Sequence, residues 1–325
     1  MLLARTLYGV IASLTVSLAA LPAAHASDYP NRPVRLIVPS AAGGGTDIVG
    51  RLLAQKLSQS LGQQVYVENK PGAGQMIGID MVAKAPPDGY TLLMAASTLA
   101  LNPVMYKQVP YDTVNDLAPI SEIANLPNVL VVHPSVQAES VEQLLALARR
   151  NPGKLTFASA GVGTSPHMSM ELFASMAKVD LLHVPYKGTG PAILDLVGGQ
   201  VSMMMGNTLS VLPHIKAGKL RALGVSSKTR NAAVPDLPPI AEAGVPGYES
   251  VQWYGLLAPA GTPSAIIDRL HSEVVRALAS DDMKRQLATE GATPVGSRPS
   301  EFGALIKSEL QKWTAVAKAA RIEPQ

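Results

Sequence analysis

The amino-acid sequence predicts an α/β fold built around parallel sheets. Apolar segments of three to five residues alternate with helical segments along most of the chain, as where 34–38 precedes a helix that ends at Gly62. Glycine-rich loops, 41–45 and 159–163, separate an apolar segment from a helical one at two places. Short apolar strands alternating with helices are typical of parallel α/β sheets. Hydrophobic residues make up 47% of the chain and charged residues 16%, which suits a sizeable core.

The first 26 residues have the three parts of a secretory signal peptide. Arg5 supplies a positive charge, an apolar stretch covers 6–20, and residues 24–26 (Ala-His-Ala) match a small-x-small cleavage pattern. The apolar stretch is shorter than the roughly 20 residues that cross a bilayer. A buried core helix is the alternative, but such helices seldom begin at the first residue. We therefore expect cleavage before Ser27 and a mature protein in the periplasm.

The mature chain is long enough for one large domain or two ordinary ones, and it carries little net charge. Removal of residues 1–26 from the 325-residue chain leaves 299, and the loss of Arg5 lowers the formal net charge from +3 to +2. Because no run of lysine and arginine with interleaved aromatic residues occurs, we expect no nucleic-acid partner. The chain has no cysteine, so we expect neither disulfides nor a lipid-modified cysteine. We also expect a soluble monomer.

Apolar periodicity predicts the elements in chain order. The predicted strands are 34–38, 65–67, 90–94, 129–133, 155–158, 203–205 and 253–258. The predicted helices are 48–61, one ending near Lys84, 140–150, one through Leu172 and Phe173, and two amphipathic helices over 266–278 and 302–313. We expect those last two helices to cover the sheet of the first domain. The methionines at 203–205 are interpreted as core, with a pocket lining as the alternative.

Two further local signals complete the reading of the elements. Ser140 and Gln143 have the spacing of a capping box at the start of the 140–150 helix. Residues 231–247 are rich in proline, glycine and alanine without periodicity, which predicts a linker or a surface excursion.

Signatures of catalysis and of cofactor binding are absent from the sequence. The motifs G-x-S-x-G, G-x-x-x-x-G-K-[ST] and G-x-G-x-x-G do not occur. The histidines after the leader show no H-E-x-x-H or other paired spacing, and without cysteine a zinc site is improbable. Lone histidines are usually capping or core residues. We therefore expect a protein that is not an enzyme and that uses neither metal nor cofactor.

Two loops instead have the composition of anion-binding sites. The first glycine loop is Gly43-Gly-Gly-Thr-Asp47 and the second glycine loop is Gly161-Val-Gly-Thr-Ser165, each between a predicted strand and the start of a helix. A helix amino terminus offers unpaired N–H groups and a partial positive charge, and glycine permits close approach to the backbone. Ordinary turns and N-caps are the alternative reading of either loop alone. Two such loops in an exported chain favour binding of a carboxylate or phosphate.

Motifs in a fixed order link the mature chain to one protein family. They are Tyr29-Pro-Asn-Arg-Pro-Val-Arg-Leu-Ile-Val-Pro39, the first glycine loop, Asn69-Lys-Pro-Gly-Ala-Gly74, Pro87-Asp-Gly-Tyr-Thr91, Gly161-Val-Gly-Thr164 with His167, Val184-Pro-Tyr-Lys-Gly188, Gly198-Gly-Gln200, Lys216-Ala-Gly-Lys-Leu-Arg221 and Trp253-Tyr-Gly-Leu-Leu-Ala-Pro-Ala-Gly-Thr-Pro263. In these motifs the chain resembles the tripartite tricarboxylate transporter substrate-binding proteins, the Bug family. The resemblance covers nearly the whole mature chain.

The resemblance implies a periplasmic binding protein fold of the type II-like kind, with two α/β domains, a hinge, and a ligand cleft between them. Domain I is expected at 27–123 plus 246–325 and domain II at 124–245, after a signal peptide at 1–26. The residues implied in ligand binding are Gly43, Gly44, Gly45, Thr46, Gly161, Gly163 and Thr164, with Ser97, Thr98, Tyr186 and Gly188 as further candidates for the cleft wall.

Asp47 belongs to the same set but would repel a ligand carboxylate. An aspartate in a first helical turn is a normal stabiliser, so we expect it to face the helix start or a bridging water. The chain also departs from the family near the presumed pocket. Gln75-Met76 follows Gly74 where members often continue Gly-Asn, and Ala41-Ala42 stands where proline is common.

The resemblance implies a receptor that captures a small carboxylate-bearing molecule and delivers it to an inner-membrane tripartite permease. A periplasmic sensor that feeds a signalling partner is the first alternative. A periplasmic enzyme or a protein-binding module that uses the same cleft is the second, and the lack of a nucleophile–base pair argues against an enzyme. Dicarboxylates, tricarboxylates, aromatic acids, amino acids and neutral vitamins all remain compatible with the sequence.

Overall fold

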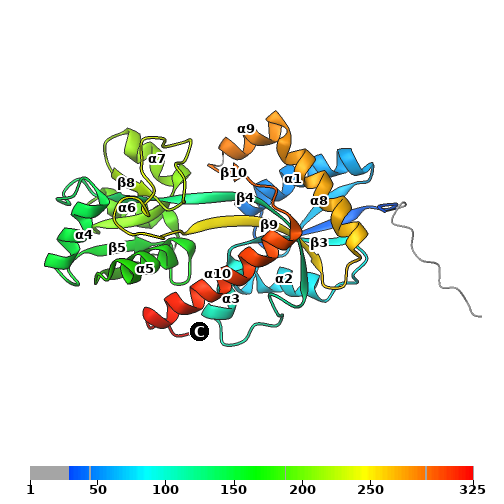
Figure 1. Cartoon of the computed structure of the whole chain (residues 1–325), viewed down its shortest axis with the longest axis horizontal. Coiled ribbons are helices and arrows are strands. Elements are labelled where there is room, and N and C mark those ends of the chain that lie inside the picture. The colour runs from blue at the N-terminus through cyan, green and yellow to red at the C-terminus, as the bar shows by residue number, and fades with distance from the viewer. Residues whose placement is uncertain (1–28, 44, 187, 290, 325) are drawn as a thin grey trace, which may run out of the picture.

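The computed structural model describes residues 29–43, 45–186, 188–289 and 291–324. The chain forms two α/β lobes that lie side by side and are joined by two long strands, β4 and β9 (Figure 1). The predicted signal peptide and Gly44 of the first glycine loop lie outside the described residues.

The strands alternate with helices as the sequence predicts. The strands are β1 (Val34–Val38), β2 (Val65–Asn69), β3 (Thr91–Ala96), β4 (Leu117–Val132), β5 (Thr156–Ser159), β6 (Leu182–Pro185), β7 (Met203–Asn207), β8 (Arg221–Val225), β9 (Val251–Pro259) and β10 (Thr293–Pro294). The helices are α1 (Gly45–Leu61), η2 (Ala73–Gln75), α2 (Met76–Ala83), α3 (Thr98–Met105), α4 (Val141–Arg150), α5 (Ser165–Ala177), α6 (Thr189–Val197), α7 (Thr208–Lys216), α8 (Ser264–Ala279), α9 (Asp281–Thr289) and α10 (Pro299–Ala319).

The sheet order explains how the lobes are joined. The strands run in the order β2-β1-β3-β9-β4-β7-β5-β6, and β8 and β10 also pair with β4. In one lobe β1 pairs in parallel with β2 and β3, and in the other β5 pairs in parallel with β6 and β7. Strands β4 and β9 are antiparallel neighbours that continue from one lobe to the other. The carboxyl ends of parallel strands open a crevice for ligands in folds of this kind.

The predicted α/β architecture is confirmed, and two expectations about its elements need correction. The strand expected at 129–133 is the end of the 16-residue β4. The last helix, expected to cover the sheet of the first domain, contacts α3 and β4 but also α5 in the other lobe. In Figure 1 α10 runs obliquely from the lobe that contains β3 towards α5 of the other lobe. The helix therefore links the lobes in addition to covering one of them.

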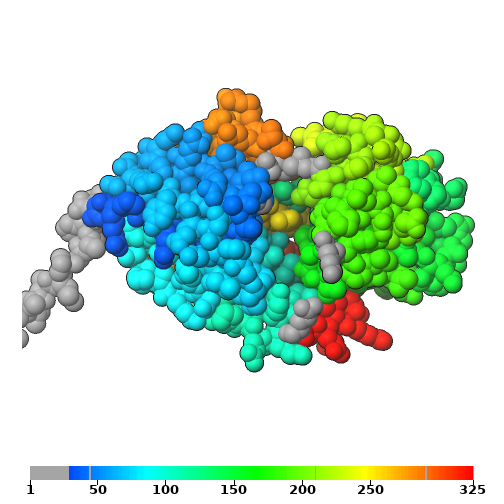
Figure 2. Space-filling model, turned by 180° about the vertical axis from the view of Figure 1, so that it is seen from behind, coloured from blue at the N-terminus to red at the C-terminus, as the bar shows by residue number. Residues whose placement is uncertain are grey.

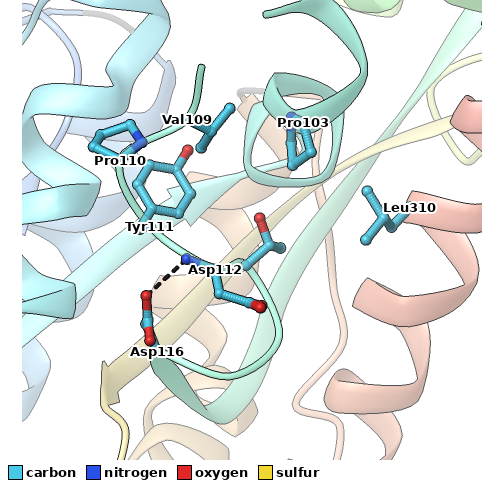
Figure 3. Close-up of a pocket in the computed structure, with 8 residues that line it drawn as sticks. Pro103, Val109, Pro110, Tyr111, Asp112, Asp116 and Leu310 are labelled. Atoms are coloured by element: carbon cyan, nitrogen blue, oxygen red, sulfur yellow. Dashed lines mark hydrogen bonds between the residues drawn. The ribbon is translucent and has the colours of Figure 1, made fainter. Parts of the chain in front are cut away.

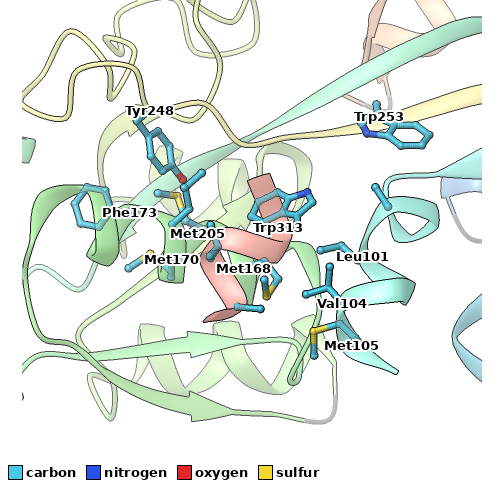
Figure 4. Close-up of a cluster of buried hydrophobic side chains, with 14 of the residues drawn as sticks. Leu101, Val104, Met105, Met168, Met170, Phe173, Met205, Tyr248, Trp253 and Trp313 are labelled. Carbon is cyan, nitrogen blue, oxygen red and sulfur yellow. The ribbon is translucent and has the colours of Figure 1, made fainter. Parts of the chain in front are cut away.

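Apolar packing explains why α10 crosses the boundary between the lobes. Its Trp313 is 3% exposed and belongs to one buried cluster with Met105 of α3, Met168 of α5 and Met205 of β7 (Figure 4). Fully burying such a side chain contributes roughly 1.5–3 kcal/mol. The packing of this cluster therefore holds α3, α5 and α10 together. The methionines at 203–205 are all buried in strand β7, as the core interpretation predicts.

Candidate functional site

A cleft lies between the two lobes on the side where the parallel strands end. The space-filling view shows the N-terminal segments and the middle segments on either side of a hollow, with part of β9 visible deep inside it (Figure 2). Strand β1 leads to the first glycine loop and β5 to the second. Strand β3 leads to Ser97 and Thr98, and β6 to Tyr186. The topology therefore brings the predicted site residues to one region of the molecule.

Asp47 closes the first glycine loop. Its Oδ2 accepts hydrogen bonds from the Gly43 N–H at 2.8 Å and from Arg51 Nε at 2.9 Å, and its Oδ1 accepts from Asn69 Nδ2 at 2.8 Å. Burial by itself would raise the pKa of Asp47, but the hydrogen bonds from Arg51, Gly43 and Asn69 outweigh it and lower the pKa. The carboxylate is thus ionised and fully engaged with protein groups. It shapes the loop, and the first turn of α1 contributes its unpaired N–H groups beside it.

The second glycine loop is held by bonds within the loop and to α5. The Thr164 hydroxyl donates to the Gly161 carbonyl oxygen at 2.7 Å, and the Gly163 N–H donates to His167 Nδ1 at 3.1 Å. Gly161 and Gly163 have φ values of 132° and 77°, which side chains other than glycine rarely adopt. The first turn of α5 has no preceding helical carbonyls, so the N–H groups of Ser165 and His167 lack a helical partner. Pro166, between them, has no N–H.

Two stacked histidines stabilise this loop. The rings of His167 and His183 stack with centroids 4.0 Å apart, and Phe157 stacks on His183 at 4.7 Å. His183 Nε2 is 2.7 Å from the Ser159 hydroxyl, and Ser159 in turn accepts from the Gly161 N–H at 3.1 Å. Burial, and secondarily the neighbouring His167, lower the pKa of His183 to about 4. A neutral imidazole therefore helps to fix the loop that Gly161 begins.

A cavity of about 190 Å³ connects the second glycine loop to the opposite lobe. It is lined by Gly74, Thr98, Leu101, Asn102, Met105, Tyr106, Val162, Gly163 and Thr164. A Cβ atom at Gly163 would lie 2.8 Å from Met105 Cε, so the loop approaches α3 closely. The cavity is therefore bounded by both lobes, as a site that depends on their relative position would be.

The structure brings some of the predicted residues together and gives others internal partners. Thr98, Gly163 and Thr164 line the cavity between the lobes. The residues outside its lining are Gly43, Gly45, Thr46, Asp47, Ser97, Gly161, Tyr186 and Gly188.

Several of these residues outside the lining have protein partners. Ser97 donates its N–H to the Trp253 carbonyl at 3.1 Å, and Gly188 donates to Ala160 at 3.1 Å. The Tyr186 hydroxyl donates to Asp195 at 2.7 Å. These bonds position the strand ends on either side of the cleft.

Sequence reasoning did not identify part of the cavity wall. Asn102, Met105 and Tyr106 all line it from α3 and its end. Gln75, which the sequence singles out only as a family departure, accepts a hydrogen bond from the Thr98 hydroxyl at 2.6 Å. No motif marks α3 as a binding element, although its position directly after the buried strand β3 places it at the cleft.

A larger cavity of about 460 Å³ lies elsewhere, where α3 and the following segment meet α10 (Figure 3). Asp112 in its wall accepts from the N–H groups of Val114 and Asn115 at 2.8 and 2.9 Å, and its own N–H donates to Asp116 at 2.7 Å. The bonds that the Asp112 carboxylate accepts lower its pKa, the one from the Asn115 N–H most. The polar groups of Asp112 therefore stabilise a turn, and no described residue of either glycine loop lines this cavity.

None of the described helices is long and apolar enough to span a bilayer. Within the same part of the chain, no three side chains of the histidine, aspartate or glutamate type are grouped to hold a metal ion.

Comparison with known proteins gives consistent matches. Residues 49–322 match the tripartite tricarboxylate transporter family receptor. Protein BugT of Bordetella pertussis is 39% identical over 295 residues, which cover 90% of each chain. A Rhodopseudomonas palustris protein solved with adipate is 37% identical, with a TM-score of 0.75 over 92% of this chain and 100% of that one.

A second Rhodopseudomonas palustris structure, MatC with bound malate, is 33% identical and has a TM-score of 0.70 over 89% of this chain and 99% of that one. These matches confirm the type of fold and the resemblance seen in the sequence. The chain belongs to the tripartite tricarboxylate transporter receptor family, as a solute-binding receptor of the Bug type.

Proposed function

We propose that this protein is an extracytoplasmic receptor that captures a small carboxylate-bearing molecule between its lobes and presents it to a tripartite tricarboxylate-type permease. The observation that carries the proposal is the cavity bounded by Gly163 and Thr164 on one side and by α3 on the other. Two units at 27–123 plus 246–325 and at 124–245 would close around the ligand, with β4 and β9 as the connecting strands.

The first turns of α1 and α5 provide the chemistry for a carboxylate. Helix α1 begins within the first glycine loop and α5 at the last residue of the second, and each first turn offers N–H groups without helical partners. A hydrogen bond to a charged group contributes roughly 1.5–3 kcal/mol, and the helix dipole adds a favourable field. Arg51 is engaged with Asp47 and Asn69, so we assign recognition to backbone groups rather than to this cation.

The related structures support a carboxylate as the ligand class. One was solved with adipate and the other with bound malate, and both molecules carry two carboxylates. The predicted signal peptide supports an extracytoplasmic location, and mass spectrometry of the exported protein beginning at Ser27 would test it. Retention of Met1 in the exported protein would contradict this part of the proposal.

A thermal-shift screen of the mature protein against a panel of organic acids tests the function. A ligand at 100 times its dissociation constant adds about 2.7 kcal/mol of stability, which gives a clear rise in melting temperature. We expect at least one small carboxylate to produce this rise in the wild-type protein but not in Gly163→Val. A panel in which no acid stabilises the folded wild-type protein would contradict the proposal.

A further inference from the structure

The described wall of the cavity between the lobes is uncharged. The nine described residues that line it are glycine, apolar, hydroxyl or amide residues. A carboxylate moved into such a space would lose its water shell without gaining a cation, and this is costly. The cavity begins at Gly163 and Thr164, so it extends from the place where the proposed function puts one ligand carboxylate.

Asn102 gives this wall a defined polarity. Its Nδ2 donates to the Gly74 carbonyl at 3.0 Å and to the Tyr111 hydroxyl at 2.9 Å, and the side chain lies in α3. A carbonyl oxygen can only accept, so the orientation of the amide is fixed and Oδ1 remains as an acceptor. Among the described residues, no group donates to this Oδ1. An acceptor at the wall disfavours a carboxylate oxygen and favours a ligand hydroxyl or N–H.

Part of the cavity wall is apolar. The apolar part of the lining comes from Leu101, Met105 and Val162, and Val162 is 48% exposed at the rim. An aliphatic segment of a ligand matches these apolar walls.

We infer, resting on the proposed function, that this cavity selects carboxylates with an uncharged tail that ends in a hydroxyl or amide, and that Asn102 is a specificity-determining residue. The first carboxylate stays at the glycine loops, and the tail lies against α3. Dicarboxylates of the same length place a second charge against Asn102 and the apolar side chains. The protein should therefore differ in preference from relatives that were solved with dicarboxylates.

Calorimetry with three probes of equal chain length tests this inference on the wild-type protein. The probes are 6-hydroxyhexanoate, hexanoate and adipate at pH 7.5. We expect 6-hydroxyhexanoate to bind at least about 10-fold more tightly than adipate, with hexanoate between them, because only adipate carries a second charge. Equal or tighter binding of adipate overturns the inference and leaves the proposed function standing. If none of the three binds, the inference is wrong, and the acid panel then decides the proposed function separately.

Adding a charge at the cavity rim provides the reciprocal test. Val162→Lys places a cation at an exposed position of the lining, so adipate should gain at least about 10-fold in affinity relative to 6-hydroxyhexanoate. Val275→Lys is the matched control, because Val275 of α8 is similarly exposed at 40% and is not part of the cavity lining. An unchanged preference in folded Val162→Lys, or an equal change in Val275→Lys, overturns the inference.

Discussion

At the scale of single residues, the first glycine loop carries an acidic side chain at a proposed anion site. Asp47 is only 2% exposed, and each of its oxygens accepts from a protein donor. Arg51 balances its charge within the same helix, four residues later. An acidic residue in the first turn also interacts favourably with the helix dipole. The aspartate therefore organises the loop, and its charge is compensated before a ligand arrives.

Replacement of Asp47 by asparagine should affect folding more than binding. Asp47→Asn removes the charge and turns one acceptor into a donor that faces Gly43, Arg51 or Asn69. We expect a loss of about 1–3 kcal/mol in the free energy of unfolding. The dissociation constant for an identified acid should change by less than about 3-fold. Denaturant unfolding and calorimetry measure the two quantities, and a large loss of affinity with unchanged stability would assign Asp47 to the ligand instead.

The stacked histidines predict how stability depends on pH. The pKa of His183 is lowered to about 4 in the folded protein, from 6.5 without the fold, chiefly by burial and then by His167. Between these values the unfolded chain binds the extra proton, so stability falls as the pH drops from 6.5 towards 4. His183→Gln should flatten this part of the profile in thermal denaturation. His214→Gln serves as the control, and an unaltered profile in His183→Gln would refute the assignment.

At the scale of elements, the second glycine loop works because its backbone has a shape that side chains would prevent. Gly163 has a φ of 77° and lies against Met105 across the cleft. The Thr164 hydroxyl donates to the Gly161 carbonyl, so the donors available beside the loop are the N–H groups of Ser165 and His167 in the first turn of α5. The family resemblance implies that Thr164 binds the ligand. In the structure its hydroxyl has a protein partner, and the residue also lines the cavity between the lobes.

Gly163→Val should weaken ligand binding by at least about 100-fold, because a branched side chain opposes the positive φ and meets Met105. Gly218→Val is a matched control. Gly218 has a φ of 68°, and a Cβ there would meet no atom within 4 Å. Both variants carry similar backbone strain, so calorimetry should show a binding loss in Gly163→Val alone. Equal affinities would show that the loop does not contact the ligand.

The sequence revealed the elements whose patterns are local and missed those set by the fold. Ser140 caps α4 by accepting from the Gln143 N–H at 3.3 Å, as its spacing predicts. Strand β4 escaped notice before residue 129 because Pro119 and Pro127 interrupt it and its register shifts between Pro119 and Ser121. Helix α3 has Pro103 inside it and an almost wholly buried surface, so it shows no amphipathic period.

The candidate site also has residues that the sequence predicts and residues that only the fold brings to it. The glycine loops could be predicted because glycine, a helix start and a hydroxyl are neighbours in the chain. Asn102 and Met105 could not be predicted, because their place in the cavity wall depends on which turn of the other lobe lies opposite them. Gln75 has a φ of 75°, a left-handed conformation that its residue type does not predict.

At the scale of the whole molecule, three segments cross between the lobes. Strands β4 and β9 pair along their length from Leu117 with Pro259 to Pro127 with Val251. Helix α10 reaches α5 through the cluster that contains Trp313. Glu122 of β4 has its pKa raised to about 7, mainly by burial and then by Glu249 and Glu309. Paired strands and a buried apolar cluster thus connect the two lobes.

Hydrogen–deuterium exchange measured by mass spectrometry tests the central claim, that one carboxylate is held by backbone N–H groups from both lobes. The ligand is the acid that gives the largest thermal shift. At saturation, exchange should slow in peptides that contain the start of α1 (45–47) and in peptides that contain the start of α5 (165–167), because bound N–H groups are protected. Slowing at only one of these helix starts, or at neither while calorimetry shows full occupancy, would contradict the account.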